Sequence, residues 1–143
     1  MALVEMIDEL LTILHEQPEY RAFHLDSQSV VLEDYLEIRP QKRAQIEGYI
    51  REGRILVGPW YILPDEYFVG GENLIRNLLL GHQVSKAHGG VSKIGYSPFS
   101  WGQISQLHQL YAGFGIDLIM FYRGVNSLES PGAEFVWEGA DGT

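Results

Sequence analysis

The sequence predicts an α/β fold in which short parallel strands alternate with helices. Four apolar segments have the length and composition of strands, and segments with helical spacing lie between them. Gly or Pro residues close most of these segments. Strands that alternate with helices form parallel sheets, because each crossover helix returns the chain to the edge where the preceding strand began.

Helices are predicted where apolar side chains recur every three or four residues. The first such pattern covers residues 2–16, and Pro18 ends it. Another helix begins at Pro40, which suits a first helical turn, and closes near Gly53. The remaining predicted helices cover residues 32–38, 72–87 and 104–112.

Strands are predicted over residues 22–25, 55–63, 93–97 and 116–122. The segment 116–122 is apolar almost throughout, as expected for a strand buried on both faces. Pro59 lies inside the second strand and indicates a bulge or the strand's last turn. Residues 134–138 alternate in polarity and reach a turn at 139–142, which predicts the first strand of a hairpin.

The chain is predicted to be one segment of an α/β catalytic domain, over residues 1–143, incomplete at both ends. It opens in a helix with no strand before it and closes on half a hairpin. A sheet of about four parallel strands would leave two exposed edges, which natural proteins usually cover. The length of 143 residues is sufficient for one apolar core.

Composition argues against several classes of partner. The formal net charge of −9 disfavours duplex nucleic acid and anionic membranes. No apolar run is long enough to span a bilayer, and the absence of cysteine excludes disulfides and thiolate metal sites. The amphipathic start, without the pattern of a signal peptide, predicts a cytoplasmic protein or a chain that lacks its natural start.

Polar and aromatic side chains gather at the predicted carboxyl ends of the strands, where α/β folds place their chemistry. Carboxylates, flat rings and an arginine suit a sugar, because rings cover the C–H faces of a pyranose and charged groups bond its hydroxyls. The candidate substrate-binding residues are Asp26, Trp60, Asp65, Trp101 and Arg123.

Each candidate also has a structural interpretation. Trp60 is more readily explained as a core residue, because aromatic side chains are usually buried. Asp26 is as readily explained as a helix cap or a turn former at a strand end. For Arg123, directly after an apolar strand, the simplest expectation is an ion pair with a carboxylate.

His24 and Asp26 have the spacing of two side chains on one face of a strand, so both could reach one metal ion. A catalytic site needs about three protein ligands, and no other histidine has helpful spacing to this pair. The pattern therefore favours a polar strand end, and no metal ligand is assigned in this chain.

A resemblance to a known family rests on many blocks in order. The longest is Gly-Arg-Ile-Leu-Val-Gly-Pro-Trp-Tyr at 53–61, and Phe-His-Leu-Asp-Ser-Gln precedes it at 23–28. Further blocks lie at 32–37, 39–40, 64–66, 71–73, 75–78, 95–96, 100–102, 113–117 and 123–125. Together these blocks resemble the front part of the family 38 glycoside hydrolases, the α-mannosidases.

The resemblance implies a partial parallel (β/α) barrel from a retaining, metal-dependent enzyme that cleaves α-mannosidic bonds. In the family, zinc or another divalent ion is held by a His-x-Asp pair on the first strand, an Asp after Gly-Tyr, and a later His. That Asp is also the nucleophile, and its position here is occupied by Phe99. The other metal ligands and the acid/base Asp would lie outside residues 1–143. Trp101 and Arg123 correspond to family residues at the metal-bound sugar.

Three hypotheses follow. The first is a fragment of an α-mannosidase-like protein that has no activity as this chain and binds no catalytic zinc. The second is a pseudoenzyme that still binds an α-mannoside or oligosaccharide through Trp101, Arg123 and the carboxylates at the strand ends. The third is a structural or assembly segment whose sheet edges pair with another copy in a homo-oligomer.

Overall fold

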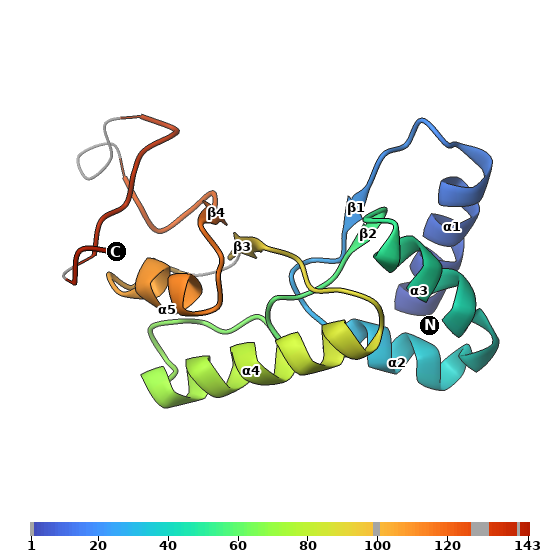
Figure 1. Ribbon diagram of the computed structural model, residues 1–143, viewed down its shortest axis with the longest axis horizontal. Coiled ribbons are helices and arrows are strands. Elements are labelled where there is room, and N and C mark those ends of the chain that lie inside the picture. Colours follow the sequence, from blue (N-terminus) through green and yellow to red (C-terminus); the bar gives the residue numbers. More distant parts are fainter. Residues whose placement is uncertain (1, 99–100, 127–131, 140) are drawn as a thin grey trace.

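The computed structural model describes residues 2–98, 101–126, 132–139 and 141–143. Helices and short strands alternate along the chain, as Figure 1 shows. In order, the elements are α1 (Ala2–Glu16), β1 (Phe23–His24), α2 (Val30–Ile38), the 3-10 helix η1 (Pro40–Lys42), α3 (Arg43–Arg51), β2 (Ile55–Leu56), α4 (Gly71–Ala87), β3 (Ile94–Tyr96), α5 (Leu107–Gly113) and β4 (Leu118–Met120). The predicted alternation of helices and strands is confirmed.

The strands pair in parallel, as predicted. Phe23 of β1 lies opposite Ile55 of β2, and β3 pairs in the same sense with β4. A backbone hydrogen bond from Ser92 N to the Val57 carbonyl, 2.8 Å long, joins the two pairs. The structure therefore contains two two-stranded parallel sheets linked by this bond, in place of the single sheet of about four strands that the sequence predicts.

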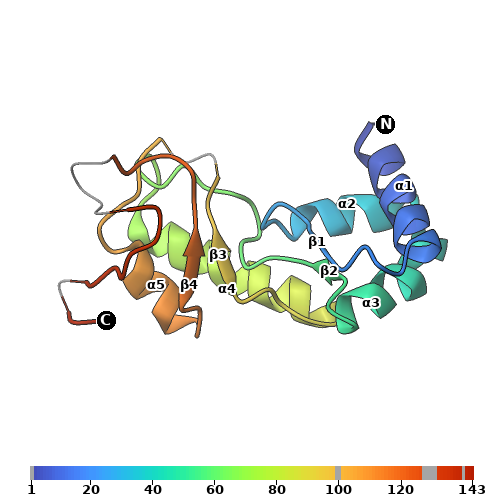
Figure 2. The same ribbon diagram turned by 90° about the horizontal axis from the view of Figure 1, so that it is seen from above.

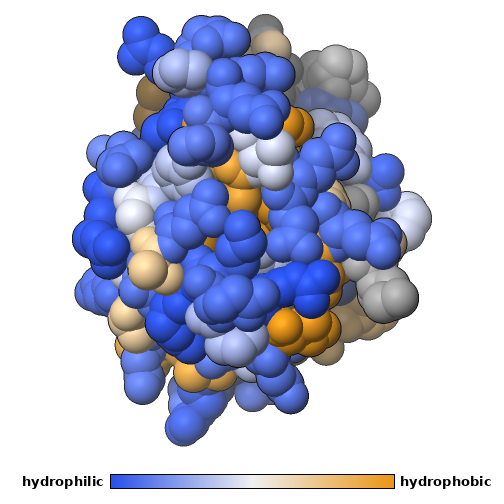
Figure 3. All heavy atoms as spheres, turned by 90° about the vertical axis from the view of Figure 1, so that its right-hand side faces the viewer, coloured by the Kyte–Doolittle hydropathy of each residue, from blue (hydrophilic) through white to orange (hydrophobic). Residues whose placement is uncertain are grey.

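One apolar core lies where α1, α2 and α3 pack against the first strand pair. The helical spacing of α1 directs Ile7, Leu11 and Leu14 into this core. Figures 1 and 2 show the three helices grouped at one end of the molecule. Figure 3 views that end and shows mainly hydrophilic residues on its outer surface. Among the described residues, no helix has the length and apolar character needed to cross a bilayer.

A second core surrounds the contact between α4 and the segment that follows β2. Trp60 is completely buried there, and its indole nitrogen donates a hydrogen bond of 2.8 Å to the Tyr111 hydroxyl. Gly81 permits the close approach of α4, because a Cβ at this position would lie 2.2 Å from the Pro59 carbonyl oxygen. In Figure 1, α4 runs along the lower edge beneath the strands.

All four strands are shorter in the structure than the sequence predicts, and two of them differ most. The strand predicted over 55–63 ends at Leu56, because Gly58, with φ of 73°, and Pro59 turn the chain away from extended geometry. The strand predicted over 116–122 forms only between Leu118 and Met120. These two side chains are 51% and 50% exposed, so the expectation of burial on both faces is wrong for β4.

The predicted hairpin strand at 134–138 does not form a strand in the structure. The turn predicted after it is present, because Gly142 N donates to the Gly139 carbonyl at 3.0 Å. Gly139 N in turn donates to the Thr143 carbonyl at 2.8 Å. Residues 134–138 have the alternating polarity of a strand but pair with no other strand among the described residues. An unpaired extended segment gains no ladder of hydrogen bonds.

Candidate functional site

The segments that follow β2, β3 and β4 contact one another beyond the carboxyl ends of the strands. The Tyr67 hydroxyl, after β2, donates to the Gln103 carbonyl at 3.4 Å. The Gln103 side-chain nitrogen, after β3, donates to the Arg123 carbonyl at 3.2 Å. A Cβ on Gly124 would lie 2.8 Å from backbone atoms of Gly102 and Gln103, so these segments touch through their main chains. Three strand ends therefore form one continuous surface.

Trp101 and Arg123 lie together on this surface. The guanidinium carbon of Arg123 is 5.2 Å from the centre of the Trp101 ring and 5.1 Å from that of Tyr122. Contacts of this kind contribute roughly 0.5–1 kcal/mol at exposed sites. Trp101 is 76% exposed, so most of its ring is accessible to a ligand. Among the described residues, Arg123 forms no ion pair, and the simple expectation of a carboxylate partner is replaced by contact with aromatic rings.

Asp26 lies in a tight turn directly after β1. Asp26 and Ser27 both adopt left-handed backbone conformations, with φ of 45° and 58°. The Gln28 side chain donates to Asp26 Oδ2 at 3.1 Å and accepts a hydrogen bond of 3.2 Å from Leu63 N. Non-glycine residues with positive φ are uncommon, and Asp tolerates this geometry better than most. Asp26 therefore forms the turn after β1 and is also a candidate substrate-binding residue, so the two interpretations of Asp26 do not exclude each other.

Both ring nitrogens of His24 lie within hydrogen-bond distance of neighbouring groups. Its Nδ1 accepts a hydrogen bond of 3.2 Å from Ser27 N, and its Nε2 lies 3.3 Å from the Ser92 hydroxyl. Burial lowers the pKa of His24, and the charge of Asp26 opposes this shift. Burial of the Tyr96 hydroxyl, together with the nearby charge of Asp26, raises the pKa of Tyr96. The Tyr96 ring packs edge-on against His24, with ring centres 5.6 Å apart.

The described residues do not fit the zinc that the family resemblance implies. Among them there is no group of three or more His, Asp or Glu side chains that could hold a metal ion. The imidazole of His24 and the carboxylate of Asp26 are already engaged with Ser27 and Gln28. The position of the family nucleophile, Phe99, lies outside the described residues.

Asp65 lies within the segment between β2 and α4, and one of its carboxylate oxygens is unusual. Within the described part of the chain, its Oδ1 is buried and has no hydrogen-bond partner. A buried acceptor without a partner is costly, so such atoms usually meet water or a ligand. The next residues of this segment contact Gly102 and Gln103, which places Asp65 close in sequence to the surface of Trp101 and Arg123.

Trp60 does not belong to this surface. It is completely buried in the second core and packs edge-on against Tyr111, with ring centres 5.6 Å apart. A side chain with no exposed surface makes no contact with a ligand, so the structure favours the core interpretation of Trp60 over the predicted contact with a sugar.

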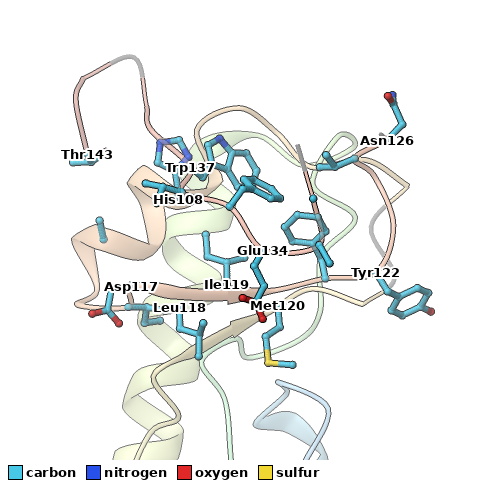
Figure 4. Close-up of a pocket in the computed structure, with 18 of the residues that line it drawn as sticks. His108, Asp117, Leu118, Ile119, Met120, Tyr122, Asn126, Glu134, Trp137 and Thr143 are labelled. Atoms are coloured by element: carbon cyan, nitrogen blue, oxygen red, sulfur yellow. The ribbon is translucent and has the colours of Figure 1, made fainter. Parts of the chain in front are cut away.

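Two hollows adjoin the strands. One of about 720 Å³ is lined by His24, Asp26, Gln28, Tyr96 and neighbouring apolar residues of α1. A larger one of about 1320 Å³ lies between β4, α5 and the C-terminal segment. Figure 4 shows His108 and Trp137 side by side at one end of this hollow, while Tyr122 points away from them. Met120 lines both hollows, so the exposed face of β4 borders each of them.

Sequence reasoning missed Tyr67, Gln103 and Tyr122 as members of the site. Tyr122 lies just beyond the end of β4, as Tyr96 lies at the end of β3, so its position in the sequence was an available signal. Tyr67 and Gln103 had no such signal, because their roles depend on contacts between residues far apart in the chain, 36 residues in the Tyr67–Gln103 bond and 20 in the Gln103–Arg123 bond.

Comparisons with known proteins point to one family. The model of the glycosyl hydrolases family 38 N-terminal domain matches residues 2–143. A curated relative from Halalkalibacterium halodurans, provisionally named a mannosylglycerate hydrolase, is 39% identical over 99% of this chain. The chain spans only 17% of the length of that relative.

Solved structures agree with the sequence comparisons. An α-mannosidase from Enterococcus faecalis V583 matches 87% of this chain with 35% identity and a TM-score of 0.82. A family 38 glycosyl hydrolase from Enterococcus faecalis matches 85% of it with 36% identity and a TM-score of 0.75. In both cases the match covers 14% of the solved chain.

Proposed function

The chain belongs to glycosyl hydrolase family 38, within the family's N-terminal domain, and on this basis we propose that it carries part of the sugar-binding edge of a protein that acts on α-mannosides. The activity and substrate of the whole protein belong to this proposal, because the chain spans a small part of its relatives. The relatives named for α-mannoside and mannosylglycerate chemistry support it.

The observation that carries the proposal is the pairing of Trp101 with Arg123. An exposed indole face beside a guanidinium offers a stacking surface and hydrogen-bond donors within one sugar's reach. Asp26 and Asp65, which are both partly exposed, are proposed to supply carboxylate acceptors for hydroxyl groups. Arg123 has no ion pair among the described residues, so it also suits an acidic sugar derivative such as mannosylglycerate.

The chain alone is proposed to be inactive and to hold no catalytic zinc. A phenyl ring at the nucleophile position neither ligates a metal ion nor attacks an anomeric carbon. In an active family member, the metal would polarise the sugar and the missing carboxylates would form and break the glycosyl intermediate. No such step is assigned to residues of this chain.

The chain is further proposed to form part of a (β/α) barrel. Leu118 and Met120 are half exposed on one face of β4, where apolar residues favour cover by further strands. The same observation favours the alternative of an assembly segment, in which a second copy covers this face. Sedimentation at increasing protein concentration distinguishes them, because a concentration-dependent dimer supports the assembly alternative.

A ligand titration tests the sugar-binding proposal. Methyl α-mannoside and mannosylglycerate are titrated into the chain, with methyl α-galactoside as the mismatched sugar, and binding is followed by isothermal titration calorimetry, which does not depend on any one side chain. Trp101→Ala and Arg123→Ala are each expected to raise Kd at least tenfold, or about 1.4 kcal/mol. Arg76→Ala, which removes an exposed arginine of α4 that pairs with Glu72, is the matched control. Equal Kd values for wild type and Trp101→Ala would contradict the proposal.

A separate measurement tests inactivity. Metal content and turnover of an aryl α-mannoside are measured on the same purified sample. We expect neither zinc in stoichiometric amount nor turnover. Zinc with turnover would show that the argument from Phe99 is wrong and would redirect attention to His24 and Asp26.

A further inference from the structure

Glu66 is a buried carboxylate that contacts both sides of the turn bearing Trp101. It is only 2% exposed. Its Oε1 accepts a hydrogen bond of 2.6 Å from the Ser97 hydroxyl, directly after β3. Its Oε2 accepts one of 3.3 Å from Ile104 N, three residues after Trp101. One side chain from the segment after β2 therefore bonds to both ends of residues 97–104.

The residue next to Glu66 fixes the middle of the same turn. The Tyr67 ring packs so closely on Gly102 that a Cβ at Gly102 would lie 2.3 Å from Tyr67 Cε2. The Tyr67 hydroxyl bonds to the Gln103 carbonyl, and the Gln103 side chain bonds to the Arg123 carbonyl. A continuous set of contacts therefore runs from the segment after β2, through the Trp101 turn, to Arg123.

The burial of Glu66 has a physical cost that its contacts must offset. A carboxylate removed from water is tolerated when its oxygens are hydrogen-bonded, and bonds to an ionised acceptor are stronger than neutral ones. Both oxygens of Glu66 accept bonds, so the carboxylate constrains the two ends of the turn at once. A side chain that only filled space would not need two acceptors aimed at Ser97 and Ile104.

We propose that Glu66 is a positioning residue that holds Trp101 beside Arg123 and so sets the affinity of this surface for a sugar. Glu66 acts through the turn and does not itself contact the ligand. The effect on affinity rests on the proposed function of the Trp101–Arg123 surface, whereas the effect on the conformation of Trp101 does not.

The test uses two variants and one matched control. Glu66→Gln keeps the shape of the side chain but removes its charge and one of its two acceptors. Glu66→Ala removes both acceptors. Glu72→Ala is the control, because Glu72 is a carboxylate 70% exposed on α4 that pairs with Arg76. Folding of each variant is checked by circular dichroism, and all titrations are made where the protein is fully folded.

The first readout is the indole N–H signal of Trp101 in a protein labelled at tryptophan nitrogen. In both Glu66 variants this signal is expected to shift or broaden, while the Trp60 signal, fixed by Tyr111, stays in place. Glu72→Ala should move neither signal. A general loss of structure would move both signals, so the difference separates positioning from mere stability. If Glu66→Ala fails to fold, Glu66→Gln alone decides the test.

The second readout is sugar affinity. Glu66→Gln is expected to raise Kd at least fivefold and Glu66→Ala at least tenfold, with Glu72→Ala unchanged. An unmoved Trp101 signal in folded Glu66→Gln and Glu66→Ala overturns the positioning role. If the wild-type chain binds no mannoside, the proposed function fails, and the Trp101 signal still decides the role of Glu66.

Discussion

Replacing Gly81 with Ala has two opposing effects on stability, a gain in helix propensity and a steric clash with the backbone. Gly81 lies inside α4, where replacing glycine with alanine ordinarily stabilises a helix by about 0.5–1 kcal/mol. A Cβ at this position would, however, lie 2.2 Å from the Pro59 carbonyl oxygen and 2.4 Å from Tyr61 N. These are backbone atoms, so no side-chain rotation relieves the contact. Overpacking usually costs about 1–3 kcal/mol, and steric repulsion is therefore expected to exceed the helical gain.

The contact involves backbone atoms, so we place its cost at about 3 kcal/mol, the top of the usual range for overpacking. After the helical gain of about 0.5–1 kcal/mol is subtracted, Gly81→Ala is expected to lower the free energy of unfolding by about 2 kcal/mol. Gly48→Ala is the matched control, because Gly48 lies inside α3 and a Cβ there meets nothing within 4 Å. That variant should gain about 0.5–1 kcal/mol. Urea unfolding followed by circular dichroism measures both. A Gly81→Ala variant as stable as wild type would show that the close approach of α4 to the segment after β2 is not real.

Three further predictions concern His24 and the Trp60–Tyr111 bond. Asp26→Asn should lower the pKa of His24 further below its usual value, because Asp26 opposes the lowering by burial; an NMR titration of the imidazole measures this. Since the pKa of His24 is depressed in the folded state, the stability linked to it should be present above pH 6.5 and decline as pH falls through the folded-state pKa. Tyr111→Phe should cost about 1–3 kcal/mol, because it leaves the buried indole N–H of Trp60 without a partner, whereas the partly exposed Tyr20→Phe should cost little. Equal urea midpoints for these two variants would contradict the assigned bond.

The helices and the parallel order of the strands could be predicted because their signals are local. The apolar spacing of residues 2–16 is sufficient to define α1, and Pro18 marks its end. Strand length was less predictable. The apolar composition of 55–63 continues past Leu56, but the backbone of Gly58 does not remain extended. Composition indicates burial, and only the backbone geometry determines pairing.

The candidate site was predictable only in part, for a related reason. Its position at the strand ends follows from the alternation of strands and helices, and Trp101 and Arg123 do lie together there. Trp60 occupies an equivalent place in the sequence but turns into the core. The contacts of Glu66 could not be predicted, because Ser97 and Ile104 come close to it only when the chain folds.

The docking of Tyr67 on Gly102 also limits how this family's loops can be exchanged. The turn that bears Trp101 packs against the segment after β2, because Gly102 leaves space for the Tyr67 ring. If residues 97–104 alone were transferred into a related protein, the Glu66 carboxylate and the Tyr67 ring that contact them would be absent. The segment after β2 and residues 97–104 therefore have to be transferred together, and a substitution in one of them is expected to alter the conformation of the other.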